Sequence, residues 1–258
     1  MPAAQLHDAV VLGTVDYGER DRVVRLLCPE LGRLACLARG ARGSRRRFGG
    51  VLDLGARLRV LLRPGRGELY HLQEAELHTA RLRLREDLLA MALCGYACEL
   101  LGAFAREQHP EPRLFGLLEV FLTVLDAASA PPGSLFRAGL ELKALHCAGL
   151  TPILTRCAAC GLPMAGPCRF SADAGGALHA ACGEGEDVAP AFLAALERAL
   201  RRPLLELLDQ DLPPGPRALL ARFAEHHLGR GLRARAWLEA QEAEAQGSVS
   251  SGSARSPS

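Results

Sequence analysis

The chain lacks the features that mark a membrane protein or a nucleotide-dependent enzyme. No apolar run in its 258 residues reaches about 18 residues, the length of a membrane-spanning helix. Residues 1–8 lack the basic and apolar segments of a signal peptide. The sequence has neither a Gly-rich phosphate loop ending in Lys-Ser or Lys-Thr nor a Gly-x-Ser-x-Gly elbow. We therefore expect a cytoplasmic protein that does not contact a membrane. We also expect neither nucleotide hydrolysis at a phosphate-binding loop nor catalysis by a serine at such an elbow.

Aromatic residues and lysine are also scarce. Aromatics make up 5% of the chain, and in the first 80 residues only Tyr17, Phe48 and Tyr70 are candidates for stacking on nucleotide bases. Stacking contributes roughly 1–3 kcal/mol per base, so a domain with few aromatics must bind nucleic acid mainly through its phosphates. Such binding is independent of base sequence and weakens with salt. Lys143 is the only lysine, so arginine supplies nearly all the positive charge.

The overall composition is that of a globular chain in a reducing compartment. Hydrophobic residues make up 49% of the sequence, enough for a sizeable core and more than one domain. Nine cysteines, an odd number, do not suggest a disulfide framework. Five of them lie in apolar runs and are interpreted as small core residues: Cys28, Cys36, Cys94, Cys98 and Cys147.

The other cysteines include a metal-binding pattern. Cys157-Ala-Ala-Cys160 and His179-Ala-Ala-Cys182 are two ligand pairs, each with a two-residue gap, separated by a Gly/Pro-rich loop. Such a gap turns both side chains toward one point, and two pairs complete the tetrahedral shell of zinc. Three thiolates and one imidazole leave no open position, so the predicted zinc is structural. Cys168, inside the loop, is an alternative to His179 as the third ligand.

Charge is distributed unevenly along the chain. Residues 20–66 contain thirteen arginines and three acidic residues, a net charge of +10, so the remainder carries −8 of the total of +2. The loop 39–47 alone has five guanidinium groups, each able to form forked hydrogen bonds with phosphate. We predict that it binds nucleic acid; the alternative is a solvated charge run without a partner. The candidate DNA-binding residues are Arg20, Arg22, Arg39, Arg42, Arg45, Arg46 and Arg47.

Hydrophobic periodicity predicts an α+β multidomain protein. Short apolar runs separated by turn signals predict five strands, at residues 9–15, 23–27, 34–38, 56–62 and 69–76. Five short strands suggest a closed OB-type barrel, although an SH3-like barrel has a similar pattern. Steps of three and four then predict helices, at residues 89–104, 114–125, 135–145, 192–200 and 219–237.

These elements give a predicted domain organisation in which a zinc knuckle is inserted into a helical domain. The N-terminal OB-fold DNA-binding domain covers residues 1–80. The helical domain covers 81–155 and 185–242, with the zinc-binding module at 156–184 between its two parts. The Ser/Gly/Ala-rich segment 243–258 is expected to be a disordered tail.

Four short motifs occur in the order typical of a known family. They are Tyr17-Gly-Glu-Arg-Asp21, Arg39-Gly-Ala-Arg42, the knuckle after Gly149-Leu-Thr-Pro152, and Leu228-Gly-Arg-Gly-Leu232 before Trp237-Leu238. In these motifs the chain resembles RecO, the bacterial recombination mediator of the RecF pathway, over all but the tail. Two positions depart from the family pattern. Gly43 stands where lysine is often found, and His179 where the third metal ligand is usually cysteine.

The resemblance implies a function in DNA repair and homologous recombination. It implies an OB domain that binds single- and double-stranded DNA, a helical domain and a zinc module. It also implies annealing of complementary strands, binding to strands coated by single-stranded-DNA-binding protein, and loading of RecA together with RecR. The place of action would be the cytoplasm, in association with the nucleoid, and no covalent chemistry would be involved.

Two other classes of function compete with a mediator. A zinc deaminase is suggested by His109-Pro-Glu111 before Cys157, but prolines flank Glu111 and Arg156 precedes the cysteine pair, which does not fit that motif. His226 and His227 are adjacent on a predicted helix and point apart, so they do not form a catalytic pair. The remaining alternative is a non-enzymatic RNA-binding or transcription-associated scaffold with an OB fold and a zinc knuckle.

Overall fold

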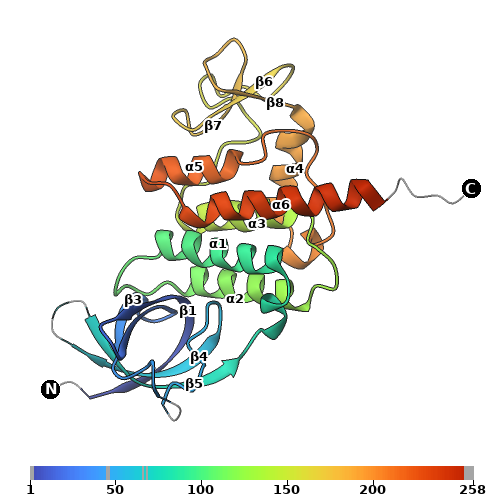
Figure 1. Cartoon of the computed structure of the whole chain (residues 1–258). Helices are drawn as coiled ribbons and strands as arrows, with labels where there is room; N and C mark the ends of the chain where they lie inside the picture. Colours follow the sequence, from blue (N-terminus) through green and yellow to red (C-terminus); the bar gives the residue numbers. More distant parts are fainter. Residues whose placement is uncertain (1–2, 45–46, 66, 68, 253–258) are drawn as a thin grey trace, which may run out of the picture. The chain divides into compact units, whose positions relative to one another are not determined.

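The computed structural model describes residues 3–44, 47–65, 67 and 69–252 (Figure 1). The chain divides into two compact units. The first contains the chain up to Ala127 together with the segment from Arg233 onward, and the second contains Ala128–Leu232. Within the described part of the chain, no helix combines the length and hydropathy needed to cross a membrane.

The first unit begins with a closed five-stranded barrel. Its strands are β1 (Gln5–Tyr17), β2 (Asp21–Cys28), β3 (Gly32–Ala38), β4 (Arg57–Pro64) and β5 (Leu69–Thr79). They are ordered β1-β2-β3-β5-β4 around the barrel, and only β3 and β5 pair in parallel. This is the OB-type topology, so the predicted barrel is confirmed and the SH3-like alternative is not needed. The strands also extend up to four residues beyond the predicted runs.

The barrel interior is filled by the alternating apolar residues of its strands. On β2, Val24, Leu26 and Cys28 are fully buried, and Cys36 on β3 faces them from the neighbouring strand. Burial raises the pKa of Cys36 to about 12, so its thiol is neutral and packs as a small apolar group. Phe48, a candidate for base stacking, is only 2% exposed and belongs to this core. It is therefore not available to a nucleic acid.

Three helices and a short 3₁₀ turn complete the first unit: η1 (Leu82–Arg85), α1 (Leu88–Phe104), α2 (Pro112–Ala127) and α6 (Arg233–Gly252). Asp87 caps α1 by accepting a hydrogen bond from the Ala90 amide at 2.7 Å. Gly102 allows α1 to approach the barrel closely, because a Cβ there would be 2.9 Å from the Leu12 side chain. The Glu99 carboxylate accepts hydrogen bonds from the first amides of α6, which joins α6 to α1.

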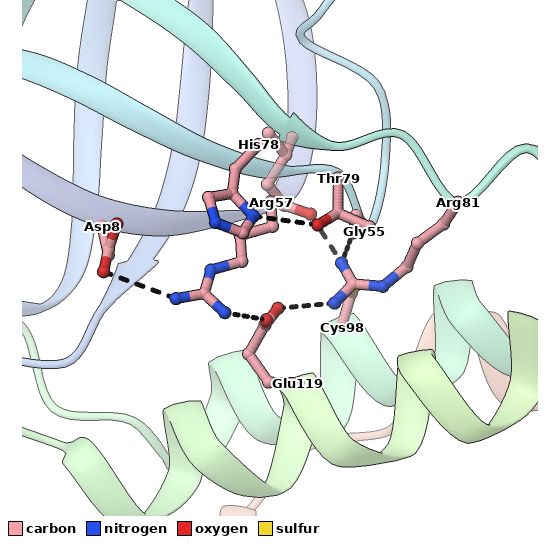
Figure 2. A network of polar contacts seen from close by, with 9 residues as sticks. Asp8, Gly55, Arg57, His78, Thr79, Arg81, Cys98 and Glu119 are labelled. Atoms are coloured by element: carbon pink, nitrogen blue, oxygen red, sulfur yellow. Dashed lines mark hydrogen bonds and ion pairs between the residues drawn. The ribbon is translucent and has the colours of Figure 1, made fainter.

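A buried ion network joins α2 to the barrel (Figure 2). Glu119 on α2 accepts hydrogen bonds from Arg57 on β4, at 3.0 Å, and from Arg81, at 2.7 Å. Arg57 also pairs with Asp8, and Arg81 donates to the Gly55 carbonyl. The Arg81 side chain is 2% exposed and that of Glu119 is 13% exposed. The two charges are therefore largely removed from water and depend on each other.

The second unit contains three helices, a second 3₁₀ turn and a small sheet. They are α3 (Ser134–Cys147), β6 (Cys168–Ser171), β7 (Gly176–His179), β8 (Glu186–Val188), α4 (Pro190–Arg201), η2 (Leu204–Leu207) and α5 (Leu219–Leu228). The Lys143 ammonium on α3 donates to the Leu200 carbonyl on α4 at 2.9 Å. Phe170 on β6 packs edge-to-face on Phe223 of α5, so the small sheet packs against α5.

The C-terminal helices differ from the sequence-based prediction. The single helix expected over 219–237 is two helices, because Gly229 adopts a left-handed φ of 64° and ends α5. Trp237, the last residue of that predicted helix, lies on α6 and is 41% exposed. Helix α6 also continues to Gly252, into the segment expected to be a disordered tail; the first four residues of that segment, 243–246, are the strong helix formers Ala, Glu and Gln. Residues 253–258 lie outside the described residues.

Candidate nucleic-acid interface and metal centre

The β1–β2 turn and the loop after β3 are joined at one end of the barrel. The Asp21 carboxylate accepts a hydrogen bond from the Gly40 amide at 2.7 Å. The Arg42 amide donates to the Arg20 carbonyl at 3.1 Å. Two segments about 20 residues apart in sequence are thereby held together, and their arginines form one surface.

We call this the arginine surface; its described members are Arg20, Arg22, Arg39, Arg42 and Arg47. All but Arg22 are exposed, and Arg22 is partly buried. Arg45 and Arg46, also predicted to bind DNA, lie outside the described residues. The structure therefore brings five of the seven predicted arginines to one end of the barrel.

Two arginines of this surface share one carboxylate. Arg22 Nε donates to Asp16 at 3.0 Å, and Arg42 Nε lies 3.6 Å from the other Asp16 oxygen. The Asp16 side chain is 51% exposed. Exposed ion pairs contribute only about 0–1 kcal/mol, so a phosphate can replace this carboxylate at small cost. Asp16 is not among the site residues predicted from the sequence, although an acid beside an arginine-rich segment is a signal for such pairing.

The loop after β3 is further ordered around Arg47. Its guanidinium donates to the Arg39 carbonyl at 2.9 Å and lies 5.2 Å from the Phe48 ring centroid. The Ala75 amide of β5 donates to the Arg47 carbonyl. The burial of Phe48 therefore anchors the end of the arginine-rich loop against the barrel.

The other end of the β2–β3 pair is covered by the connection between α1 and α2. The Arg33 amide donates to the Arg106 carbonyl, and the Gln108 amide donates to the Arg33 carbonyl. Gly32, with a left-handed φ of 66°, lies against carbonyl oxygens of this connection, which leave no room for a side chain. The open part of the β1–β2–β3 surface is thus the end that carries the arginine surface.

The second site is a cluster of the four predicted metal ligands. The ligand atoms of Cys157, Cys160, His179 and Cys182 all lie within 4.8 Å of one another. Ligand atoms around a tetrahedral zinc ion are separated by about 3.5–3.8 Å, so small side-chain adjustments would complete the shell. His179 Nδ1 lies 3.4 Å from Cys160 Sγ, whereas its Nε2 lies 3.1 Å from the Pro163 carbonyl. With Nδ1 toward the cluster, an Nε2–H donor to this carbonyl would fix the ring.

Tight turns and short strands hold these ligands in place. The Gly161 amide donates to the Cys157 carbonyl at 2.9 Å, which closes the turn between the first two cysteines. The Cys182 amide donates to the His179 carbonyl at 2.8 Å, which closes the second turn. His179 ends β7, whose neighbour in the sheet is β6. Each pair thus comes from a turn of fixed geometry, and the residues fit a metal ion.

The protein environment gives the thiols of the cluster different acidities. Burial raises the pKa of Cys157, but hydrogen bonds from backbone groups of Cys160, His179 and Ala159 outweigh it and lower the pKa to about 6. Desolvation and the neighbouring Cys160 and Cys157 thiols raise the pKa of Cys182 to about 11. Metal binding requires thiolates, so metal loading would displace protons from this cluster.

Cys168, the alternative third ligand, lies outside the cluster. It is paired with His179 across β6 and β7, yet its thiol donates to the Gly166 carbonyl at 3.1 Å. Cys168 is 3% exposed, and burial raises its pKa. Its geometry is that of a small buried residue.

The fold and the two sites define a class of protein. It is an OB-barrel protein with an arginine-rich barrel end, followed by helices and a Cys₃His cluster in a separate unit. The family model of the recombination protein O N terminal matches residues 4–81, and that of the recombination protein O C terminal matches residues 85–236. The chain therefore belongs to the RecO family of DNA repair and recombination proteins.

Individual relatives agree with the family models. The chain is 43% identical over 240 residues to the DNA repair protein RecO of Anaeromyxobacter sp. (strain K), covering 89% of this chain and 94% of that one. It is 43% identical over 230 residues to the RecO of Myxococcus xanthus (strain DK1622), covering 88% and 93%. It is 41% identical over 177 residues to the RecO of Geobacter sulfurreducens, covering 68% and 72%. These matches include both units of the chain.

Proposed function

We propose that this chain is a DNA repair and recombination mediator that binds DNA without sequence specificity and anneals complementary strands. With RecR, it helps to load RecA on single-stranded DNA coated by single-stranded-DNA-binding protein, in the cytoplasm at the nucleoid. The observation that carries this proposal is the arginine surface at the open end of the OB barrel, in a chain of the RecO family.

The proposed mechanism follows from the charge of the phosphate chains. Two complementary strands repel each other, and arginines that partly neutralise both phosphate chains reduce this repulsion and raise the local strand concentration. Base pairing then supplies the free energy of annealing, so neither nucleotide hydrolysis nor a catalytic residue is required. Guanidinium groups suit this task because they remain charged and offer forked donors to phosphate oxygens.

The Cys₃His cluster has a structural role in this proposal. Three thiolates and one imidazole favour zinc, and four protein ligands leave no position for water or substrate. Zinc bound there would stabilise the second unit, where β6 packs on α5 through Phe170 and Phe223. An ion bound by four protein ligands would take no part in a reaction.

The test is annealing of complementary oligonucleotides without nucleotide, both naked and coated by single-stranded-DNA-binding protein, over a range of salt. We expect acceleration by the wild-type protein on both substrates. Binding without acceleration would indicate a nucleic-acid-binding scaffold, and failure to bind DNA at low salt would contradict the proposal.

The arginine surface is tested by a triple variant with a charge-matched control. Replacing Arg20, Arg39 and Arg42 with alanine should weaken single-strand binding and slow annealing. The slope of log K against log salt should flatten by up to about two units if all three contact phosphate. The control replaces Arg83, Arg113 and Arg233, three exposed arginines of the same unit, and should retain the wild-type slope. Equal slopes for both triple variants would exclude these three contacts from the interface.

A further inference from the structure

One aromatic side chain of the barrel is exposed to solvent near the arginine surface. Tyr17, the last residue of β1, is 61% exposed. Phe48 is buried in the barrel, and Tyr70 packs against the barrel core. Of the three aromatics that the sequence offered for base stacking, Tyr17 is the one with a largely exposed ring.

Tyr17 belongs to a continuous outer face of the β1–β2 hairpin. Side chains two residues apart on a strand share a face, which places Val15 beside Tyr17. On β2, Val23 pairs with Val15 and Arg25 pairs with Gly13, so they share that face. We call Val15, Tyr17, Val23 and Arg25 the outer hairpin face; Val15 is 57% exposed and Arg25 is also exposed.

The outer hairpin face combines a stacking surface with a cation. Arg25 lies over Gly13, where a Cβ would be 3.2 Å from its guanidinium, so the glycine gives the side chain room to lie along the strand. Arg25 is four positions along β2 from Asp21, the residue paired with Tyr17, a separation of about 13 Å. The ring and the guanidinium therefore lie along one face of the hairpin, and Arg20 of the β1–β2 turn follows Tyr17 by three residues.

Charge complementarity indicates what covers this face. Asp16, between Val15 and Tyr17, points to the opposite side of the strand and pairs there with Arg22 and Arg42. Asp21, opposite Tyr17, is engaged by the Gly40 amide. The exposed charges that remain beside this face are Arg20 and Glu19 of the turn and Arg25 on β2. The face is therefore aromatic and apolar with a small excess of positive charge beside it, which suits a polyanion that also has apolar surfaces. Single-stranded DNA has both properties, whereas the base faces of a duplex are stacked inside the helix.

We propose that the outer hairpin face is a subsite for unpaired bases, in which Tyr17 stacks on a base and Arg25 contacts the phosphate chain. This inference rests on the proposed DNA binding and adds a preference for single strands. The arginine surface attracts any phosphate chain, and Tyr17 adds stabilisation that only an unpaired base can receive. Arg25 thereby joins the proposed DNA-contacting residues, although it is not among the seven arginines predicted from the sequence.

The test compares Tyr17→Ala with Tyr17→Phe on three probes: oligothymidylate, an oligonucleotide of abasic sites, and a duplex. Tyr17→Ala should weaken binding of oligothymidylate by between about fivefold and a hundredfold, the range expected for one stacked base. Tyr17→Phe retains the ring and should bind like the wild type. On the abasic probe and on the duplex, Tyr17→Ala and the wild type should have equal affinity.

A matched control is available on the same strand. Leu6, at the other end of β1, is 58% exposed, so Leu6→Ala removes a similarly exposed apolar side chain. It should leave all three affinities unchanged. Unchanged oligothymidylate binding by Tyr17→Ala would overturn the subsite, and so would an equal loss on all three probes. A different result would contradict the proposed function itself: binding of none of the three probes by the wild-type protein.

Discussion

At the scale of single residues, two buried cysteines about ten residues apart have different environments. Cys157 is 1% exposed, and backbone hydrogen bonds lower its pKa to about 6. Cys168 is 3% exposed, and burial raises its pKa. Similar burial thus favours a thiolate at one position and a neutral thiol at the other, because only Cys157 receives several backbone hydrogen bonds. Position separates the two further: Cys157 lies in the four-residue cluster, whereas the Cys168 thiol donates to the Gly166 carbonyl, so we expect only Cys157 to bind a metal.

The first prediction compares Cys157→Ser with Cys168→Ser. Cys157→Ser removes one of four ligands and should lose zinc, with a severe loss of stability, since a structural zinc contributes on the order of 10 kcal/mol to folding. Cys168→Ser should keep one zinc per chain. Zinc content by atomic absorption and thermal unfolding provide the two readouts. Full zinc content in Cys157→Ser would show that the ligand set is misassigned.

At the scale of elements, the ion network of Glu119 determines how α2 is attached to the barrel. Glu119 on α2, Arg57 on β4 and Arg81 before η1 come from three separate segments (Figure 2). Arg81 adopts a left-handed φ of 48°, which turns the chain between β5 and η1. The Arg81 side chain is 2% exposed, and the Glu119 carboxylate compensates its charge. An ion pair exposed on the surface would contribute much less to the attachment of α2.

Replacing Glu119 with alanine should therefore destabilise the first unit by about 3–5 kcal/mol, because Arg81 is left buried without its acidic partner. The control is Glu107→Ala, which removes an acidic partner of Arg33 in a pair with exposed fractions of 31% and 52%. It should cost about 0–1 kcal/mol. Denaturant unfolding gives both free energies, and equal losses would contradict the assigned importance of the buried network.

At the scale of the whole molecule, the chain forms the first unit from two separate segments. Helix α6 returns to α1, where Glu99 caps it, whereas α3, α4 and α5 belong to the unit that contains the Cys₃His cluster. The helices of the predicted single helical domain thus fall into two groups: α1, α2 and α6 in the first unit, and α3, α4 and α5 in the second. A metal in the cluster would stabilise one of these groups directly.

Removing the metal should accordingly affect the two units unequally. After chelation, we expect backbone amides of β6, β7, α4 and α5 to lose protection from hydrogen exchange, since zinc binding and folding of a small metal module are coupled. Amides of β1–β5 and α1 should retain their protection. Hydrogen exchange followed by mass spectrometry measures both. Equal loss of protection in both units would contradict a structural role confined to the second.

Local pattern in the sequence was sufficient to predict the closed barrel, most of the helices and the four clustered ligands. Alternating apolar residues predict strands, and the ligand spacing belongs to individual turns, so each depends on a few neighbouring residues. The helix end at Gly229 was missed because one left-handed residue ends a pattern that otherwise continues. The attachment of α6 to α1 depends on Glu99, more than 130 residues away.

The sequence by itself determined most of the elements, the four residues of the Cys₃His cluster and the excess of arginine in residues 20–66, because these depend on composition and short spacing. Only the tertiary structure decided which side chains are accessible. It buried Phe48, exposed Tyr17, paired Arg22 and Arg42 with Asp16, and covered Arg33 with the α1–α2 connection. Burial and ion pairing arise from contacts between segments that are distant in the sequence. They therefore cannot be predicted from hydrophobic periodicity along the chain.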